Sequence, residues 1–261
     1  MHETMIDVRD GVFRTRCYTA GSGRPLVFLH GAGGLRPDAP YLDELAQHFT
    51  VYAPEHPGWG ASTGLEHLDD VRDLATYYQD LFDALGLEGP AVVGHSLGGM
   101  IAAELAAQCA HAVSRLVLVS PVGLWRDDAP VADFFTMSPD ETAQAVWHDP
   151  AGALARRYSA LPQDPEQLAG VLFERSRALA AAGKFLWPIP DKGLRKRLHR
   201  IKAPTLIVWG ESDRLVPPVY AEEFRSGIAN ARVLLLQQAG HMEPLEQQAA
   251  FVAAVCDFVL E

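Results

Sequence analysis

The segment Gly94-His95-Ser96-Leu97-Gly98 separates a short apolar run from a stretch rich in alanine. The apolar run, Ala91-Val92-Val93, is typical of a buried strand, and the residues from Leu97 to Cys109 predict a helix that packs close to a sheet. Where a strand turns directly into a helix, the two backbones approach each other, and glycine is the residue that leaves room. The segment therefore predicts a strand, a sharp turn and a helix as one unit.

Short apolar strands and helices alternate on both sides of this unit. Strands are expected at 25–29, 49–53, 115–119, 205–209 and 232–236, and helices at 69–85, 219–228 and 245–259. Two further strands, 4–8 and 12–18, are expected to pair across Arg9-Asp10-Gly11. Because such alternation is typical of a sheet covered on both faces, we predict an α/β fold with a mostly parallel sheet flanked by helices.

The segment from about 122 to 200 breaks the alternation, because it has no clear apolar strand and carries many prolines and bulky apolar residues. We interpret it as a helical insertion, so that 1–121 and 201–261 form the core. Its aromatic side chains either build a small core of their own or line a pocket. The candidate pocket residues, including three from core loops, are Leu35, Trp125, Phe134, Phe135, Trp147, Trp187, Val216 and Met242.

The charge of the chain narrows the classes of partner. The formal net charge is −11 at pH 7, which repels phosphate backbones and anionic membranes. We therefore expect a small-molecule substrate and neither a nucleic-acid nor a membrane partner, while a monomer and a homodimer both remain open. The basic run from Lys192 to Lys202 is interpreted as a solvated helix face.

Cysteine usage and the lack of targeting patterns favour the cytoplasm. The three cysteines, Cys17, Cys109 and Cys256, are far apart and odd in number, which fits a reducing compartment better than a disulfide framework. The N-terminal residues do not have the pattern of a secretory signal. No apolar stretch reaches the roughly 18 residues that a membrane span needs.

Ser96 is the candidate nucleophile. The sharp turn presents its hydroxyl, and the N-terminus of the following helix favours developing negative charge. A serine hydroxyl needs a base to take its proton, and histidine is the usual base. Of the ten histidines, His241 stands apart, because Ala239-Gly240-His241 follows a predicted strand and reaches the carboxyl edge of the sheet.

Asp213 is the candidate acid that orients this histidine. It follows the predicted strand at 205–209 and therefore lies at the same edge of the sheet as His241. A carboxylate in this position fixes the imidazole tautomer and stabilises the imidazolium. Glu211 is the nearest competitor for the role.

An oxyanion formed during acyl transfer needs two hydrogen-bond donors. Leu97 N–H, at the start of the predicted helix, is the first candidate. The second comes from the loop His30-Gly31-Ala32-Gly33-Gly34, whose small residues let a carbonyl group come close to the backbone. Ala32 N–H is preferred there, and Gly33 N–H is the alternative. We interpret His30 as a structural residue that holds the loop.

The sequence resembles the α/β-hydrolase fold superfamily. The resemblance rests on the segments 30–34, 54–62, 94–99, 204–213 and 240–241, with the candidate residues in the order Ser, Asp, His. The resemblance implies a mostly parallel eight-stranded sheet with a helical cap over the active site, and neither a metal nor a cofactor. Haloalkane dehalogenases and many epoxide hydrolases carry an aspartate nucleophile at the turn, so Ser96 argues against these branches.

Three functions remain as hypotheses. The first is a serine hydrolase that cleaves a carboxylic ester or lactone of a small or medium apolar substrate through an acyl-enzyme. The second is a C–C bond hydrolase acting on a ring-cleavage-type dienoic diketone acid, although that branch commonly has tryptophan where this chain has Met242. Its substrate carboxylate needs a cation, and the candidates are Arg36, Arg126, Arg156 and Arg157. The third is a non-catalytic ligand receptor on the same fold.

Overall fold

The computed structural model describes residues 1–189 and 192–261. Its strands form one eight-stranded sheet in the order β1-β2-β4-β3-β5-β6-β7-β8. They are β1 His2–Val8, β2 Phe13–Ala20, β3 Pro25–Leu29, β4 Thr50–Pro54, β5 Ala91–His95, β6 Arg115–Val119, β7 Thr205–Gly210 and β8 Ala231–Leu236. Strand β2 pairs antiparallel with β1 and β4, and the other neighbours are parallel. The predicted α/β fold with a mostly parallel sheet is confirmed.

The helices of the described residues agree with the predicted ones in most places. They are α1 Pro40–Leu45, α2 Val71–Leu85, α3 Leu97–Gln108, α4 Pro139–Val146, α5 Ala153–Ser159, α6 Pro165–Leu186, α7 Val219–Gly227, α8 Glu243–Glu246 and α9 Gln248–Leu260. The helix predicted over 245–259 is found as α9, but its start is displaced to Gln248. Gln247 has φ −127° and ψ 49°, outside the helical region, and separates α8 from α9.

Helix α2 shows how local sequence sets the ends of an element. Asp70 caps its N-terminus by accepting hydrogen bonds from the backbone N–H groups of Arg72 and Asp73. Gly86 ends it in a left-handed conformation with φ 65°. Between these ends, Leu74 and Tyr78 lie one turn apart on the buried face. The helix therefore covers the sheet as its periodicity predicts.

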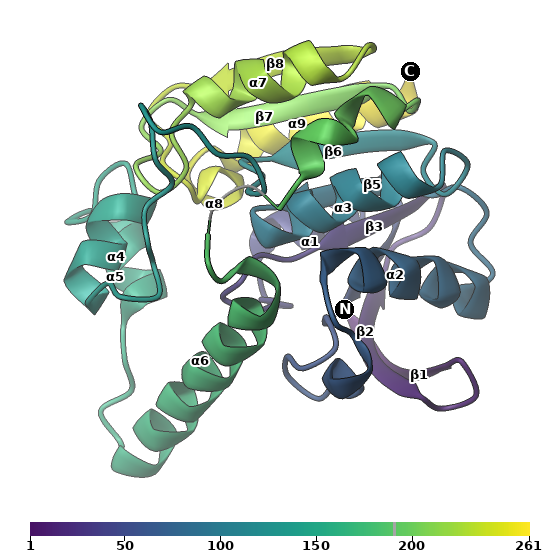
Figure 1. Cartoon of the computed structure of the whole chain (residues 1–261). Coiled ribbons are helices and arrows are strands. Elements are labelled where there is room, and N and C mark those ends of the chain that lie inside the picture. Colours follow the sequence, from purple (N-terminus) through teal and green to yellow (C-terminus); the bar gives the residue numbers. More distant parts are fainter. Residues whose placement is uncertain (190–191) are drawn as a thin grey trace.

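Helices cover both faces of the sheet, because successive residues of a strand point to opposite sides. On β5, Val92 packs in the cluster that contains α2, α3 and α7, whereas Val93 packs with α1 and α9. Figure 1 shows α2 and α3 in front of the sheet and α9 behind it. The hydrophobic core is thus divided into two layers, and the ends of the parallel strands emerge between them.

The segment between β6 and β7 is helical and contains α4, α5 and α6. Figure 1 shows these helices beyond the end of the sheet, with α6 extending away from the body of the molecule. The N-terminal half of α6 is mostly exposed, including Leu172 and Phe173. Pro190 and Asp191, within the predicted 122–200 insertion, lie outside the described residues, and the boundaries of that insertion remain a prediction.

The basic run at 192–202 is not simply a solvated helix face. It forms two 3₁₀ turns, Leu194–Lys196 and Leu198–Arg200. The Arg197 guanidinium donates to both carboxylate oxygens of Glu104, a fully buried residue of α3. Such a bidentate ion pair attaches the run to the core. Within the described ranges, no helix has the length and apolar character needed to cross a membrane.

Candidate active site

Ser96 lies at the turn from β5 into α3 in a strained backbone conformation, with φ 56° and ψ −114°. A positive φ is unfavourable for a residue with a side chain, and such strain is often found at functional sites. The glycines on either side make the turn possible. A Cβ atom at Gly94 would lie 2.3 Å from the Gly98 carbonyl oxygen, and one at Gly98 would lie 2.1 Å from the Leu29 carbonyl oxygen. The predicted close approach of strand and helix is confirmed.

Asp213 and His241 form a buried hydrogen-bonded pair, with 2.7 Å between Oδ2 of the carboxylate and Nδ1 of the imidazole. The other carboxylate oxygen accepts the backbone N–H groups of Leu215 and Val216, each at 2.9 Å. These bonds fix the carboxylate and assign the Nδ1 proton to the His241–Asp213 bond. Glu211, the competing candidate, is exposed.

The second ring nitrogen of His241, Nε2, is buried and has no hydrogen-bond partner in the described part of the chain. His95, the residue before Ser96, contacts His241. His95 Nε2 lies 2.8 Å from the His241 carbonyl oxygen, and the two imidazole rings are 5.0 Å apart. The structure therefore brings the strained serine turn and the histidine loop together at one edge of the sheet.

The loop 30–34 lies against the serine turn, because a Cβ atom at Gly31 would be 3.3 Å from Cβ of Ser96. The Gly31 carbonyl accepts hydrogen bonds from His30 Nδ1 at 2.8 Å and Gly34 N–H at 3.1 Å. The Ala32 carbonyl accepts the Trp59 indole N–H at 2.9 Å. In a trans peptide the N–H points opposite to the carbonyl. The Ala32 and Gly33 N–H groups therefore point away from these partners.

Two histidines, His30 and His56, fix this loop by hydrogen bonds to each other. His30 Nε2 accepts the backbone N–H of His56 at 3.1 Å, and the ring of His56 contacts the His30 carbonyl at 2.8 Å. The rings lie 3.7 Å apart. Burial lowers the pKa of His30 well below its ordinary value and that of His56 to about 4. Both are therefore neutral near pH 7, which agrees with the structural interpretation of His30.

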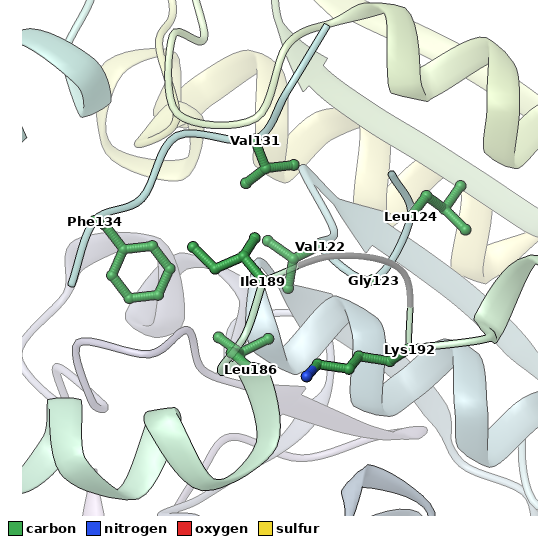
Figure 2. Close-up of a pocket in the computed structure, with 8 residues that line it drawn as sticks. All are labelled: Val122, Gly123, Leu124, Val131, Phe134, Leu186, Ile189 and Lys192. Carbon is green, nitrogen blue, oxygen red and sulfur yellow. The ribbon is translucent and has the colours of Figure 1, made fainter. Parts of the chain in front are cut away.

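An apolar pocket adjoins the serine turn, because Val122 N–H donates to the Ser96 carbonyl at 3.3 Å and Val122 also lines the pocket. Figure 2 shows the lining residues, which are Val122, Gly123, Leu124, Val131, Phe134, Leu186, Ile189 and Lys192. The pocket is narrow, with an open volume of about 10 Å³, room for about one water molecule. A larger ligand requires these side chains to move.

The Lys192 side chain extends along this pocket toward Leu186 (Figure 2). Burial lowers its pKa, and no hydrogen bond or ion pair joins its amine to another described residue. Sequence reasoning missed this residue, because it was grouped with the basic run. In the sequence, the one feature that could have indicated a pocket residue was the position of this lysine shortly after the apolar residues of 185–189.

The other candidate pocket residues are dispersed. Phe135 and Trp187 line an open outer groove of about 490 Å³ on the side of α6. Leu35, Trp125 and Met242 are half-buried against the two core clusters. Trp147 and Val216 are buried within those clusters, with 4% and 1% of their surface exposed. Of the eight candidates, Phe134 is the one that lines the pocket at Val122.

The four arginines considered as carboxylate anchors have other partners. Arg126 forms ion pairs with Asp128 and Glu223. The other three are exposed: Arg36 and Arg157 lie over the ring of Tyr158, and Arg156 donates to a backbone carbonyl. Across residues 1–189 and 192–261, no group of three or more His, Cys, Asp or Glu side chains is arranged to hold a metal ion.

Two glutamates after His241 were missed by sequence reasoning. Glu246 accepts the backbone N–H groups of Gly240 and His148, each at 2.7 Å, and so ties the histidine loop to the end of α4. Glu243 is fully buried and accepts the Ser120 hydroxyl at 2.5 Å. Their sequence signal was a pair of acidic residues within five positions of a candidate base, but the roles of these residues depend on partners far away in the chain.

Known proteins resemble this chain over nearly its whole length. The family model described as alpha/beta hydrolase fold matches residues 24–247. The chain is 29% identical to 2-hydroxy-6-oxo-6-phenylhexa-2,4-dienoate hydrolase of Comamonas testosteroni, covering 92% of this chain and 89% of that protein. It is 30% identical to 2-hydroxymuconate semialdehyde hydrolase of Pseudomonas sp. strain CF600, covering 95% and 91%. The structure of an esterase from Exiguobacterium antarcticum matches with a TM-score of 0.75 at 23% identity, covering 100% of both chains.

Proposed function

The chain belongs to the α/β hydrolase fold family, and on this basis we propose that it is a serine hydrolase with Ser96 as nucleophile, His241 as base and Asp213 as acid. The observation that carries the proposal is the buried Asp213–His241 pair, whose bonded atoms lie 2.7 Å apart. With Nδ1 engaged, Nε2 is the ring nitrogen that can accept a proton. The strained Ser96 follows a residue that contacts the same histidine.

In the proposed reaction, His241 Nε2 takes the hydroxyl proton while Oγ of Ser96 attacks the carbonyl carbon of the substrate. Asp213 stabilises the resulting imidazolium. The tetrahedral intermediate expels the alcohol, which takes the proton from His241, and an acyl-enzyme remains on Ser96. The same imidazole then removes a proton from water, which attacks the acyl-enzyme. When this second intermediate collapses, Oγ of Ser96 leaves and takes the proton back from His241, and the carboxylic acid is released.

We assign the oxyanion to Leu97 N–H and Ala32 N–H, with Gly33 N–H as the alternative to Ala32. Leu97 is the first residue of α3, so its N–H has no partner inside the helix. The Gly31 and Ala32 carbonyls are each held by donors on the opposite side of the loop. Each oxyanion donor typically contributes about 10²–10³ in rate.

A carboxylic ester or lactone of a small or medium apolar compound is the proposed substrate, and 122–200 is the proposed cap. Apart from Lys192, the residues that line the pocket at Val122 are apolar or glycine. The outer groove, about 490 Å³ in volume, is within the size range of small-molecule sites. An ester needs no charged anchor in such a lining.

The test is a graded panel of esters, lactones and dienoic acids, with Ser96→Ala as the control. We expect the wild-type protein to hydrolyse short-chain aryl esters and the variant to lose this activity. An organophosphonate should label Ser96 in the wild type, as seen by mass spectrometry of the peptide. A folded wild-type protein that turns over no member of the panel would contradict the proposal.

A C–C bond hydrolase is the second candidate, supported by two relatives named as hydrolases of a dienoate and a semialdehyde. Lys192 is the specific observation in its favour, because a partly desolvated cation in the same pocket as Val122 suits a substrate carboxylate. Lys192→Met should lower kcat/KM for dienoic acids about tenfold, as expected for one lost charged hydrogen bond. Neutral esters should be unaffected, and Lys196→Met, an exposed cation nearby, is the matched control.

We retain the cytoplasm as the proposed location. Cys17, Cys109 and Cys256 are free thiols, as expected in a reducing compartment. Burial raises the pKa of Cys17 to about 11 and also raises that of Cys256, so neither thiol is reactive near pH 7.

A further inference from the structure

Glu243, the first residue of α8, is a charged residue type with 0% of its surface exposed. One carboxyl oxygen, Oε1, accepts the Ser120 hydroxyl at 2.5 Å. The other, Oε2, is buried, lies 3.9 Å from His95 Nε2, and has no hydrogen-bond partner among residues 1–189 and 192–261. An ionised carboxylate accepts hydrogen bonds with both oxygens. The surroundings of Glu243 therefore hold too few donors for the charged form.

Titratable groups face Glu243 from several elements. Burial raises the pKa of Glu243 well above its ordinary value, and the negative charge of Asp213, after β7, raises it further. Glu246, on α8, adds to the increase. The Ser120 hydroxyl and the backbone N–H of Glu243 lower the pKa by less than burial raises it. His95, on β5, supplies no positive charge, because burial, followed by His241, lowers its pKa to about 3.

The turn that carries His241 is attached to the sheet at the histidine itself and again two residues after it. His95 Nε2 donates to the His241 carbonyl from the end of β5. Two residues later, Glu243 accepts the Ser120 hydroxyl from the end of β6. Strands β5 and β6 are neighbours in the sheet, with His95 paired with Val119. These two bonds fix the backbone from which the imidazole projects toward the serine turn.

We propose that Glu243 is a positioning residue for His241 that works in its protonated, neutral form. Its bond to Ser120 ties the start of α8, and with it the turn that carries His241, to the end of β6. In the neutral form it adds no second negative charge to the site, so Asp213 alone stabilises the imidazolium from this side. The inference rests on the proposed function, because it takes His241 as the base.

The first experiment compares Glu243→Gln with Asp213→Asn in the pH dependence of kcat/KM. Glutamine presents one acceptor and one donor group, as a protonated carboxyl does. We expect Glu243→Gln to keep wild-type kcat and the same midpoint of the acidic limb, whereas Asp213→Asn loses about 10⁴ in kcat. If Glu243 were ionised, its replacement would move the midpoint by about one pH unit or more to lower pH, and that result would overturn the proposal.

Glu243→Leu separates positioning from space-filling, because leucine fills a similar volume but makes no bond to Ser120. We expect kcat to fall about tenfold, as for the loss of one buried hydrogen bond, with KM close to that of the wild type. Thermal unfolding of each variant checks that it is folded. A Leu variant with wild-type kcat would reduce Glu243 to a packing residue, and the proposal would be wrong.

Infrared difference spectroscopy tests the protonation state without any substrate. At neutral pH, the wild-type protein should show a protonated carboxyl C=O band that is absent from Glu243→Gln. A difference that contains carboxylate bands alone would refute the neutral form. A protein that hydrolyses nothing would overturn the proposed function, and this spectrum would still decide the charge of Glu243.

Discussion

The turn at Ser96 and the helix α6 differ in how tightly neighbouring residues constrain them. At the turn, a Cβ atom on Gly98 would meet the backbone of β3 at 2.1 Å. On α6, a Cβ atom on Gly170 would meet nothing within 4 Å, and 64% of Phe173 is exposed. At position 98 in the turn, glycine is the residue type that fits, whereas position 170 on α6 can accept many residue types.

This difference separates the proposed chemistry from the proposed substrate selection. Reacting groups need fixed geometry, and a buried turn between two packed layers supplies it. A helix with few tertiary contacts can change its side chains without disturbing that turn. The end of α4 is attached to the histidine loop, because the Val146 carbonyl accepts the His241 backbone N–H at 2.8 Å.

The largest contrast is expected from removing one side chain in each region. Ser96→Ala should lower kcat by about 10⁴-fold or more, because no other group replaces the nucleophile. Trp187→Ala should leave kcat for a short aryl ester near the wild-type value and change KM for bulkier esters, since Trp187 lines the outer groove. Steady-state kinetics on both esters measure this. If both variants lost a similar factor in kcat, the proposed division between a catalytic turn and a substrate-selecting helix would be wrong.

A methyl group at the turn should be the next largest effect. We expect Gly98→Ala to lower the free energy of unfolding by about 3 kcal/mol or more, because the clash is with backbone and cannot be relieved by a rotamer change. Urea denaturation followed by circular dichroism measures the loss. Wild-type stability in this variant would show that strand and helix are not packed as closely as described.

Acid should destabilise the buried region without any substitution. His56 has an ordinary pKa of 6.5 when unfolded and about 4 when folded, because it is buried. The unfolded chain therefore takes up a proton first as pH falls. The stabilising contribution is complete above pH 6.5 and is lost as the pH falls toward 4, by up to about 3 kcal/mol.

Urea denaturation at several pH values measures this loss, and His56→Gln should reduce the slope between pH 6.5 and 4. His48→Gln, at an exposed position, serves as the control and should keep the wild-type slope. If the wild type and His56→Gln had the same slope, another group would have to account for it.

The smallest effect is expected from the matching change on α6. Gly170 is helical, and a Cβ atom added there would have no neighbour within 4 Å, so Gly170→Ala should stabilise the protein by about 0.5–1 kcal/mol. Differential scanning calorimetry measures the shift. A destabilised variant would mean that another surface covers this part of α6 in solution.

Local sequence was sufficient for elements whose boundaries depend on their own residues. β3 and β6 have the predicted bounds, because short apolar runs end at loop-forming residues. The break at Gln247 was missed, because no glycine marks it and the preceding turn is shaped by partners such as Ser120. Glu243 and Lys192 were missed for a related reason, because the surroundings of each are formed by side chains that are distant in sequence.

The sequence by itself determined the strand–turn–helix unit at Ser96, the alternating layers and the types of reactive side chain at the sheet edge. Glycine sterics and hydrophobic periodicity are local properties, so they can be recognised in the chain. Only the tertiary structure decided that Asp213 and His241 bond at 2.7 Å, that Glu243 is buried beside them, and that Phe134 and Lys192 line the same pocket. These relations depend on how the parallel strands align and on what excludes water between the loops that follow them.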